Sequence, residues 1–311
     1  MLIKRKQTTS KILMIRPTNF GFNPETAESN AFQQKAGAEH ITEIREQAVL
    51  EFDTFVKTLR EAGIQVIVVK DTARPIKTDA VFPNNWVSFH SNGTAVTYSM
   101  CAPTRRTERR YDILDALSKN FDLKRRIDFS HYESQDKFLE GTGSLIFDRV
   151  HRLVYACLSP RTEEALLDEF CEWAAYEKVQ FRAVDASGMD IYHTNVMMAV
   201  GDEFVVICLD TIQDEQEKAR LHYYFRETGK EIIEISMEQM NQFAGNMLQV
   251  ENEAGESFMV MSEQAFKSLN DTQIKQIERY AHILYSPIYT IEKYGGGSAR
   301  CMMAEVFLPD L

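Results

Sequence analysis

The chain has 311 residues, of which 44% are hydrophobic, and carries a formal net charge of −11 at pH 7. This length and composition exclude extensive disorder and allow a large buried core. The acidic balance argues against a nucleic-acid partner, which would require a basic face. No apolar run reaches the roughly 18 residues of a membrane span, and the N-terminus lacks the apolar stretch of a signal peptide, so we expect a cytoplasmic protein without membrane association.

Predicted strands and helices alternate along the chain. Residues 11–17, KILMIRP, predict a strand, residues 41–63 predict an amphipathic helix with apolar residues at three- and four-residue spacing, and residues 64–69 predict another strand. Helices of the same kind are predicted at 107–120, 159–178, 214–230 and 270–281. Most are followed by a short β-branched run that predicts a strand, at 178–184, 231–236 and 282–291.

Between these helices one type of segment recurs, in which a short polar stretch precedes two apolar strands around a turn. It is found at 81–99, 138–159, 192–210 and 243–262, and a fifth copy at 295–309 closes the chain. The unit of hairpin, helix and strand is about 50 to 60 residues long, and such a fixed period is typical of repeat architectures. The strand at 11–17 supplies what the last copy lacks, which predicts ring closure. No Pro/Gly/Ser-rich linker interrupts the series, so we expect one domain spanning residues 1–311.

The polar stretches contain residues with catalytic chemistry in equivalent places. Asn85, Glu140, His193 and Cys301 follow one another at intervals of 55, 53 and 108 residues, and the last interval is close to twice the others. If the copies surround an axis, these side chains meet at its centre. A carboxylate, a histidine, a cysteine and an amide at one point are the components of a covalent hydrolase site.

The five cysteines show no C-x-x-C spacing and predict neither a disulfide framework nor a zinc site. Cys157, Cys171 and Cys208 lie among apolar neighbours and are interpreted as core residues. Cys301 differs because it follows a run of three glycines, where the backbone can approach a ligand closely. The short basic run Arg105–Arg110 is interpreted mainly as solvated surface.

The segments LEGTGSLIFDR, YHTN and GGGSARCM resemble the glutamate, histidine and cysteine motifs of the guanidine-modifying superfamily, which has the pentein fold. That superfamily includes arginine deiminases, dimethylarginine hydrolases and amidinotransferases. Across residues 10 to 309 the chain resembles most its citrulline-utilisation hydrolases. The resemblance implies a five-bladed α/β propeller with pseudo-fivefold symmetry, a site on the axis, and no metal or organic cofactor.

Transferred position by position, the resemblance implies roles for three residues. Cys301 would be the nucleophile, His193 the general acid and base, and Glu140 the carboxylate that orients the histidine. A thiolate divides a difficult hydrolysis into formation and breakdown of a covalent intermediate, and an imidazole can both give and take a proton near neutral pH. Taken singly, His193 could be a core histidine and Glu140 a turn residue.

The chain departs from the superfamily pattern at the positions that hold the reacting group. Arginine-processing members commonly carry two carboxylates there, whereas this chain has Asn195 and Asn85, the latter preceded by Asn84. An amide can donate to a neutral oxygen and accept from a neutral N–H, so two amides suit a ureido group, which predicts citrulline as the substrate. The alternative is that Asn84 and Asn85 shape a turn and Asn195 pairs with backbone.

The leading hypothesis is therefore a hydrolase that converts L-citrulline to ornithine, carbon dioxide and ammonia. Arg16, Arg105 and Arg106 are the candidates to bind the substrate carboxylate. An arginine deiminase or a dimethylarginine hydrolase is the alternative enzyme, and an inactive propeller that senses an amino acid is the alternative of another class. The only partner expected is the small amino-acid substrate, and the sequence leaves a homodimer open.

Overall fold

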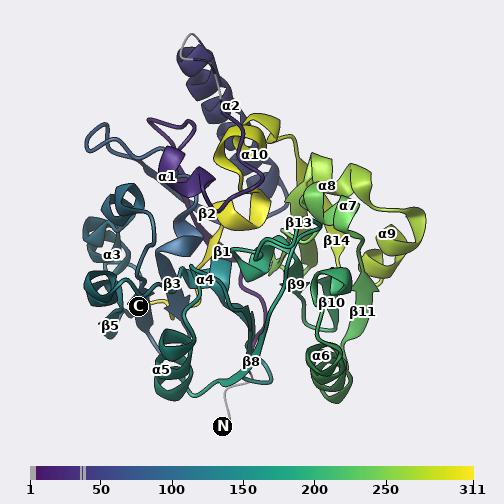
Figure 1. Cartoon of the computed structure of the whole chain (residues 1–311). Coiled ribbons are helices and arrows are strands. Elements are labelled where there is room, and N and C mark those ends of the chain that lie inside the picture. The colour runs from purple at the N-terminus through teal and green to yellow at the C-terminus, as the bar shows by residue number, and fades with distance from the viewer. Residues whose placement is uncertain (1–4, 36, 38–39) are drawn as a thin grey trace.

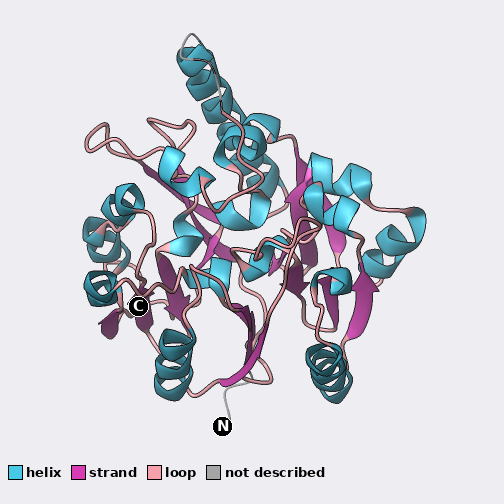
Figure 2. Cartoon of the chain, viewed as in Figure 1, coloured by secondary structure: helices cyan, strands magenta, loops and turns pink. Residues whose placement is uncertain are grey.

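The computed structural model describes residues 5–35, 37 and 40–311. Its strands form five separate three-stranded sheets, and the longer helices lie around the periphery of the molecule (Figures 1 and 2). In every sheet the central strand pairs antiparallel with one neighbour and parallel with the other. The predicted unit of hairpin, helix and strand is therefore confirmed, and the fold is a five-bladed α/β propeller.

Four blades follow the chain directly, each with an antiparallel hairpin, an outer helix and a parallel third strand. Their hairpins are β3 (Val87–His90) with β4 (Thr94–Thr97), β6 (Ile146–Asp148) with β7 (Leu153–Cys157), β9 (Met198–Val200) with β10 (Phe204–Ile207), and β12 (Leu248–Glu251) with β13 (Ser257–Ser262). Their third strands are β5 (Arg125–Asp128), β8 (Glu177–Phe181), β11 (Glu231–Glu234) and β14 (His282–Ser286). Their main helices are α3 (Tyr111–Leu117), α5 (Glu164–Ala174), α6 (Glu215–Glu227) and α9 (Asp271–Glu278).

The fifth blade joins the two ends of the chain, as the sequence predicts. Strand β15 (Ala304–Glu305) pairs antiparallel with β1 (Lys11–Arg16), and β1 pairs parallel with β2 (Gln65–Lys70). Helix α2 (Ile41–Glu61) connects β1 to β2 and buries one apolar face that includes Phe52, Phe55 and Leu59. Because β15 follows Cys301 directly, ring closure fixes the position of that cysteine relative to the other blades.

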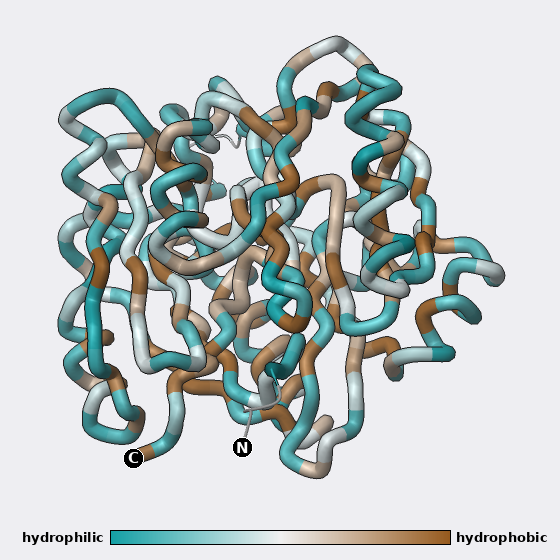
Figure 3. Tube along the Cα trace, turned by 90° about the horizontal axis from the view of Figure 1, so that it is seen from below, coloured by the Kyte–Doolittle hydropathy of each residue, from teal (hydrophilic) through white to brown (hydrophobic). Residues whose placement is uncertain are grey.

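The core is divided among the blades and consists mainly of the apolar strand residues and the inner faces of the helices. Figure 3 shows hydrophobic segments concentrated inside the molecule and hydrophilic ones along its outer coils. Cys157, Cys171 and Cys208 are buried among apolar neighbours, which confirms their interpretation as core residues. Within the described residues, no helix is long and apolar enough to cross a membrane.

Three local predictions differ from the structure. The segment 282–291 is only half a strand, because Pro287 interrupts it and helix α10 (Tyr289–Gly295) follows. The predicted helix at 107–120 is split into a 3-10 helix at Pro103–Glu108 and the shorter α3. Strand β5 was not predicted because its sequence, RRID, is mostly charged, and it forms an exposed edge beside β4.

Candidate active site

The residues directly before the first strand of each hairpin, here called the head of the hairpin, come together around the axis. Three heads are short 3-10 helices, at Pro83–Asn85, Thr194–Val196 and Ala299–Met302, and the head at Gly141–Ser144 is the four-residue helix α4. Helix α4 contacts the heads at 83–85 and 194–196, and the head at 83–85 also contacts that at 299–302. The structure thus brings together the side chains that the repeat period placed in register.

Glu140 and His193 form a buried pair. The Nε2 of His193 lies 2.7 Å from Oε2 of Glu140, while Oε1 of Glu140 accepts a hydrogen bond of 2.9 Å from the backbone N–H of Cys101. Burial alone would raise the pKa of Glu140, but Arg161 and the hydrogen bond with His193 lower it to about 2. Burial lowers the pKa of His193 to about 4, although Glu140 opposes this shift. The resting pair is therefore a carboxylate beside a neutral imidazole, and the Nδ1 of that imidazole can accept a proton.

The sulfur of Cys301 is held by two amides. Asn195 Nδ2 and Asn246 Nδ2 each donate to Sγ at 3.3 Å, and Asn246 Nδ2 also donates to the backbone oxygen of Asn195 at 2.9 Å. These contacts fix the position of the sulfur, and its S–H can in turn donate to Asn246 Oδ1 at 3.6 Å. Cys301 is 6% exposed and lines the same small cavity as His193.

Two glycines permit the heads to approach this closely. A Cβ atom on Gly143 would lie 2.4 Å from Asn85 Nδ2 and 2.7 Å from His193 Nδ1. A Cβ atom on Gly245, next to Asn246, would lie 2.3 Å from the backbone oxygen of Val196. Any larger residue at either place would push a polar head away from the axis.

Arg105 places a buried positive charge on the cavity wall. It is 3% exposed, and it donates to Glu108 (Nη2 to Oε2, 2.9 Å) and to Asn85 Oδ1 (Nη1, 3.0 Å). Its Nε also lies 3.8 Å from Oδ2 of the buried Asp79. Burial raises the pKa of Asp79, although Arg105 and Asn23 oppose the shift, and its Oδ1 has no hydrogen-bond partner in the described part of the chain.

Arg161 is the second buried cation of the site. Its Nη1 lies 3.6 Å from Oε2 of Glu140, and its guanidinium donates to Ser29 Oγ and to the backbone oxygen of Thr26. It also stacks over the ring of Tyr192 at 4.8 Å. Arg161 therefore links the Glu140–His193 pair to the segment between β1 and α2, which contributes Thr26 and Asn30 to the cavity wall.

The predicted site residues divide into those that reach the cavity and those that do not. Cys301, His193, Asn85 and Arg105 line it, and Glu140 and Asn195 contact His193 and Cys301 respectively. Asn84 is fully buried in the same head as Asn85, but it does not line the cavity, and its amide has no hydrogen-bond partner among the described residues.

Two of the three arginines proposed for the substrate carboxylate lie elsewhere. Arg16 is half-exposed at the end of β1 and pairs with Asp53 of α2 at 2.7 Å, so its assignment to the site is wrong. Arg106 does not line the cavity, donates to the backbone oxygen of Met100 and stacks over Phe138, so its assignment is also wrong. Conversely, Arg105 is buried, which corrects the interpretation of that basic run as solvated surface.

Three residues of the site were not predicted. Asn246 lies two residues before β12, in register with the other heads, so the repeat contained the signal. Asp79 and Arg161 lie outside the heads and had no such signal. Among the residues with described positions, no group of three His, Cys, Asp or Glu side chains could hold a metal ion.

The cavity itself is small. Its volume is about 20 Å³, which by this measure holds one or two water molecules. Thr26 and Asn30, from the segment between β1 and α2, form part of its wall, and Asn30 Nδ2 donates to the backbone oxygen of Gly296 at 3.1 Å. A free amino acid is larger than this cavity, so its binding requires side chains of the wall to shift.

Comparisons with known structures agree with the architecture. The apo structure of ArgZ, an arginine dihydrolase from Cyanobacteria, is 19% identical with a TM-score of 0.74, and the match covers 97% of this chain and 41% of that one. The chain thus spans less than half of full-length ArgZ. It covers 98% of the isolated N-terminal domain of ArgZ in its product complex, at 19% identity and a TM-score of 0.71.

A dimethylarginine dimethylaminohydrolase adduct with S-methyl-L-thiocitrulline is 14% identical, with a TM-score of 0.64 and coverage of 96% of this chain and 100% of that one. No protein with a curated description matches the chain. The family model described as "N,N dimethylarginine dimethylhydrolase, eukaryotic" matches residues 16–308. Together with the five blades and the heads on their axis, this match shows that the chain belongs to the dimethylarginine dimethylhydrolase family of the pentein superfamily.

Proposed function

We propose that the protein is a cysteine-dependent hydrolase that converts free L-citrulline and water to ornithine, carbon dioxide and ammonia. The observation that supports this substrate most strongly is the set of amides around the nucleophile. Asn195 and Asn246 contact the sulfur of Cys301, and Asn85 lines the same cavity. A ureido group is neutral and carries both a carbonyl oxygen and N–H groups, which amides can bind without a mismatch of charge.

The unpaired hydrogen-bonding atoms of these amides fit such a group. Asn85 Nδ2 and Asn195 Oδ1 are buried and have no hydrogen-bond partner among the described residues. One is a donor and the other an acceptor, so together they can satisfy the oxygen and an N–H of one ureido group. Buried polar groups are nearly always paired, so their lack of partners favours a ligand or water at this point.

The charged side chains on the cavity wall can bind the charged groups of a free amino acid. Arg105 and Arg161 can bind the α-carboxylate, for which a guanidinium provides a matching pair of donors. Asp79, with one oxygen unpaired, can accept from the α-ammonium group. The carboxylate of Glu108 already pairs with Arg105.

The reaction uses the groups described above in two steps. The neutral His193 takes the thiol proton of Cys301 as the sulfur attacks the ureido carbon, and the ionised Glu140 stabilises the imidazolium that results. Collapse of the tetrahedral adduct breaks one C–N bond, and His193 returns the proton to the departing amine. His193 then takes a proton from water as the water oxygen attacks the carbon of the S-carbamoyl intermediate. The C–S bond breaks, the sulfur regains its proton from His193, and the released carbamate decomposes to the second amine and carbon dioxide.

A hydrolase of arginine or of a methylated arginine is the second candidate. The family match favours it, because the matching model is described by dimethylarginine. The carboxylates of Asp79 and Glu108 also lie near the cavity and could in principle pair with a guanidinium cation. Against this, the nearest polar contacts of the nucleophilic sulfur are amides.

Incubation of the purified enzyme with citrulline, arginine, monomethylarginine and asymmetric dimethylarginine in parallel tests the proposal. Ornithine, citrulline, methylamines and ammonia would be quantified for each substrate. We expect ornithine and ammonia in equal amounts from citrulline at the highest kcat/KM. Faster release of citrulline from arginine or a methylated arginine would favour the second candidate, and no product from any substrate would favour an amino-acid sensor.

A further inference from the structure

A second pocket lies at the opposite end of the propeller axis. Each first strand of a hairpin begins at its head, beside Cys301 and His193, and ends at its turn. The pocket is lined by the end of β3 and the turn after it (His90–Asn92), by the turn after β6 (Arg149 and Arg152), by residues 306–308 after β15, and by residues 5–6 and 8–11 before and within β1. Its volume is about 830 Å³, within the usual range for sites that bind small molecules.

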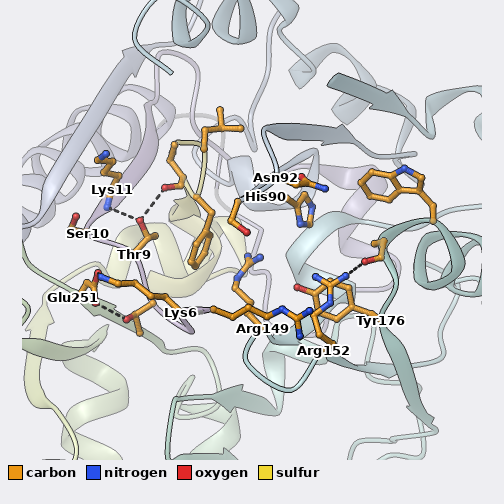
Figure 4. Close-up of a pocket in the computed structure, with 18 residues that line it drawn as sticks. Lys6, Thr9, Ser10, Lys11, His90, Asn92, Arg149, Arg152, Tyr176 and Glu251 are labelled. Carbon is orange, nitrogen blue, oxygen red and sulfur yellow. Dashed lines mark hydrogen bonds and ion pairs between the residues drawn. The ribbon is translucent and has the colours of Figure 1, made fainter. Parts of the chain in front are cut away.

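The charge of this pocket is opposite to that of the whole protein. Its lining contains five cationic side chains and one carboxylate, in a chain whose formal net charge is −11: Arg5, Lys6, Lys11, Arg149, Arg152 and Glu251. Figure 4 shows Lys6, Lys11 and Glu251 on one side, His90 and Arg152 on the other, and Arg149 between them. Burial lowers the pKa of His90 to about 3, and the positive charges of Arg149 and Arg152 add to this shift.

Arg149 is the most informative of these residues. Arg149 is only 6% exposed, yet its guanidinium makes no hydrogen bond to any residue whose position is described. Its side chain packs over the rings of Phe307 (3.9 Å) and Phe147 (4.8 Å), and its nearest acid is Glu305, with Nε and Oε1 3.7 Å apart. None of its nitrogens is both buried and unpaired, so those without a partner in the described part of the chain open into the pocket and are free to bind an acceptor from outside.

The other cations around Arg149 are only partly neutralised. Lys6 pairs with Glu251 at 2.7 Å and Lys11 with Asp310 at 2.6 Å, whereas Arg5 has no ion pair with any described residue. Arg152 donates to the backbone oxygens of Ala174 and Ala175, so it contributes charge more than free donors.

We propose that this pocket binds a phosphate ester or another small phosphorylated molecule. A phosphate group presents several charged acceptor oxygens, and a guanidinium fork such as that of Arg149 matches two of them at once. The aromatic side chains of Trp173 and Phe307 line the pocket and can cover the organic part of such a ligand. A nucleic acid does not fit, because the remaining surface of this chain is acidic.

Tryptophan fluorescence gives a direct test, because the chain has two tryptophans and only Trp173 lines the pocket, while Trp86 is buried in the core. We expect pyrophosphate and AMP to change the emission in a saturable way, and adenosine to have no effect. Arg149→Gln should weaken the binding of both anions about tenfold or more, the range for loss of charge-assisted hydrogen bonds. Arg5→Gln should also weaken the binding of both anions, and it provides the test if Arg149→Gln does not fold.

Two control variants separate this site from non-specific attraction and from the active site. Arg226→Gln removes one positive charge from the exposed face of α6, and Cys301→Ala removes the nucleophile; neither should change the affinity for pyrophosphate. The proposal fails if native protein binds neither anion saturably, or if Arg226→Gln weakens binding as much as Arg149→Gln. Tighter binding of succinate than of pyrophosphate would overturn the assignment to phosphorylated molecules.

Discussion

The two groups of side chains around the active-site cavity differ in charge. At the nucleophile the sulfur of Cys301 is contacted by neutral amides, from Asn195 and Asn246. The cavity is also lined by the buried charges of Arg105, Arg161 and Asp79, and Arg105 lies near Asp79. A buried charge without its counterion is costly, so this division favours a substrate with a neutral reacting group and a zwitterionic tail. Citrulline has this distribution of charge, whereas arginine carries an additional cation at its reacting end.

Loss of the nucleophile should have the largest effect. We expect Cys301→Ala and Cys301→Ser to abolish turnover while keeping the melting temperature of the native protein. Alanine has no nucleophile, and serine is not appreciably ionised near neutral pH. Iodoacetamide should inactivate the native enzyme, and citrulline should protect it. Peptide mapping identifies the modified residue. Inactivation that maps to Cys101, which is half-buried near Glu140, would contradict the assignment.

The catalytic pair should show the next largest effect. His193→Ala should lose nearly all turnover. Glu140→Gln keeps a side chain that can contact His193 Nε2 but removes the charge that stabilises the imidazolium, so kcat should fall by about 10²–10⁴. Glu133→Gln is a matched control, because Glu133 is a partly buried carboxylate paired with Arg109 outside the cavity. Activity of Glu140→Gln within a few-fold of native would show that the pair does not act in the reaction.

The proposed role of Arg161 in binding the substrate carboxylate can be tested with a substrate that lacks this carboxylate. N-carbamoylputrescine has the ureido group of citrulline but no carboxylate, so the native enzyme should use it poorly. Arg161→Gln should lower kcat/KM for citrulline by about 10–100-fold, as expected for a lost charge-assisted hydrogen bond, and should affect N-carbamoylputrescine much less. Equal losses for both substrates would mean that Arg161 acts only through Glu140, which lies 3.6 Å away.

The smallest effect should be a shift in the pH dependence of kcat/KM, on the acid side of the profile. His193 must be neutral to accept a proton, and burial lowers its pKa from 6.5 to about 4. The neutral form is therefore retained as the pH falls through 6.5, and kcat/KM should decline only near about pH 4. Circular dichroism at each pH separates loss of activity from loss of fold, and an acid limb centred near 6.5 would contradict the burial argument.

The ring of five blades could be predicted because the same local pattern recurs at a fixed period, and any closed arrangement of equivalent units places equivalent residues at equivalent points. This reasoning identified Cys301, His193 and Glu140, and it would also have identified Asn246 had the fourth head been treated like the others. Arg161 and Asp79 could not be found in this way. Their positions depend on contacts between distant segments, such as that of Arg161 with Thr26 and Ser29.

The three arginines proposed for the substrate carboxylate show the same limit of sequence reasoning. Arg16, Arg105 and Arg106 were equally plausible from sequence, because composition does not reveal which cation finds an acid nearby. In the structure Arg16 is neutralised by Asp53 on α2, and only Arg105 of the three reaches the cavity. Its neighbours in the same basic run have acidic or backbone partners outside it.

The most direct test of the central claim is the preference for citrulline over arginine when the amides become carboxylates. An ionised aspartate at position 195 cannot donate a hydrogen bond and would be buried without a cation, so Asn195→Asp should lower kcat/KM for citrulline by about two to three orders of magnitude. In a Cys301→Ala background, Asn85→Asp combined with Asn195→Asp should shift the ratio of dissociation constants toward arginine. If native enzyme already prefers arginine, or if the ratio stays within about twofold across these variants, the amides do not select the charge of the substrate and the proposed citrulline specificity is wrong.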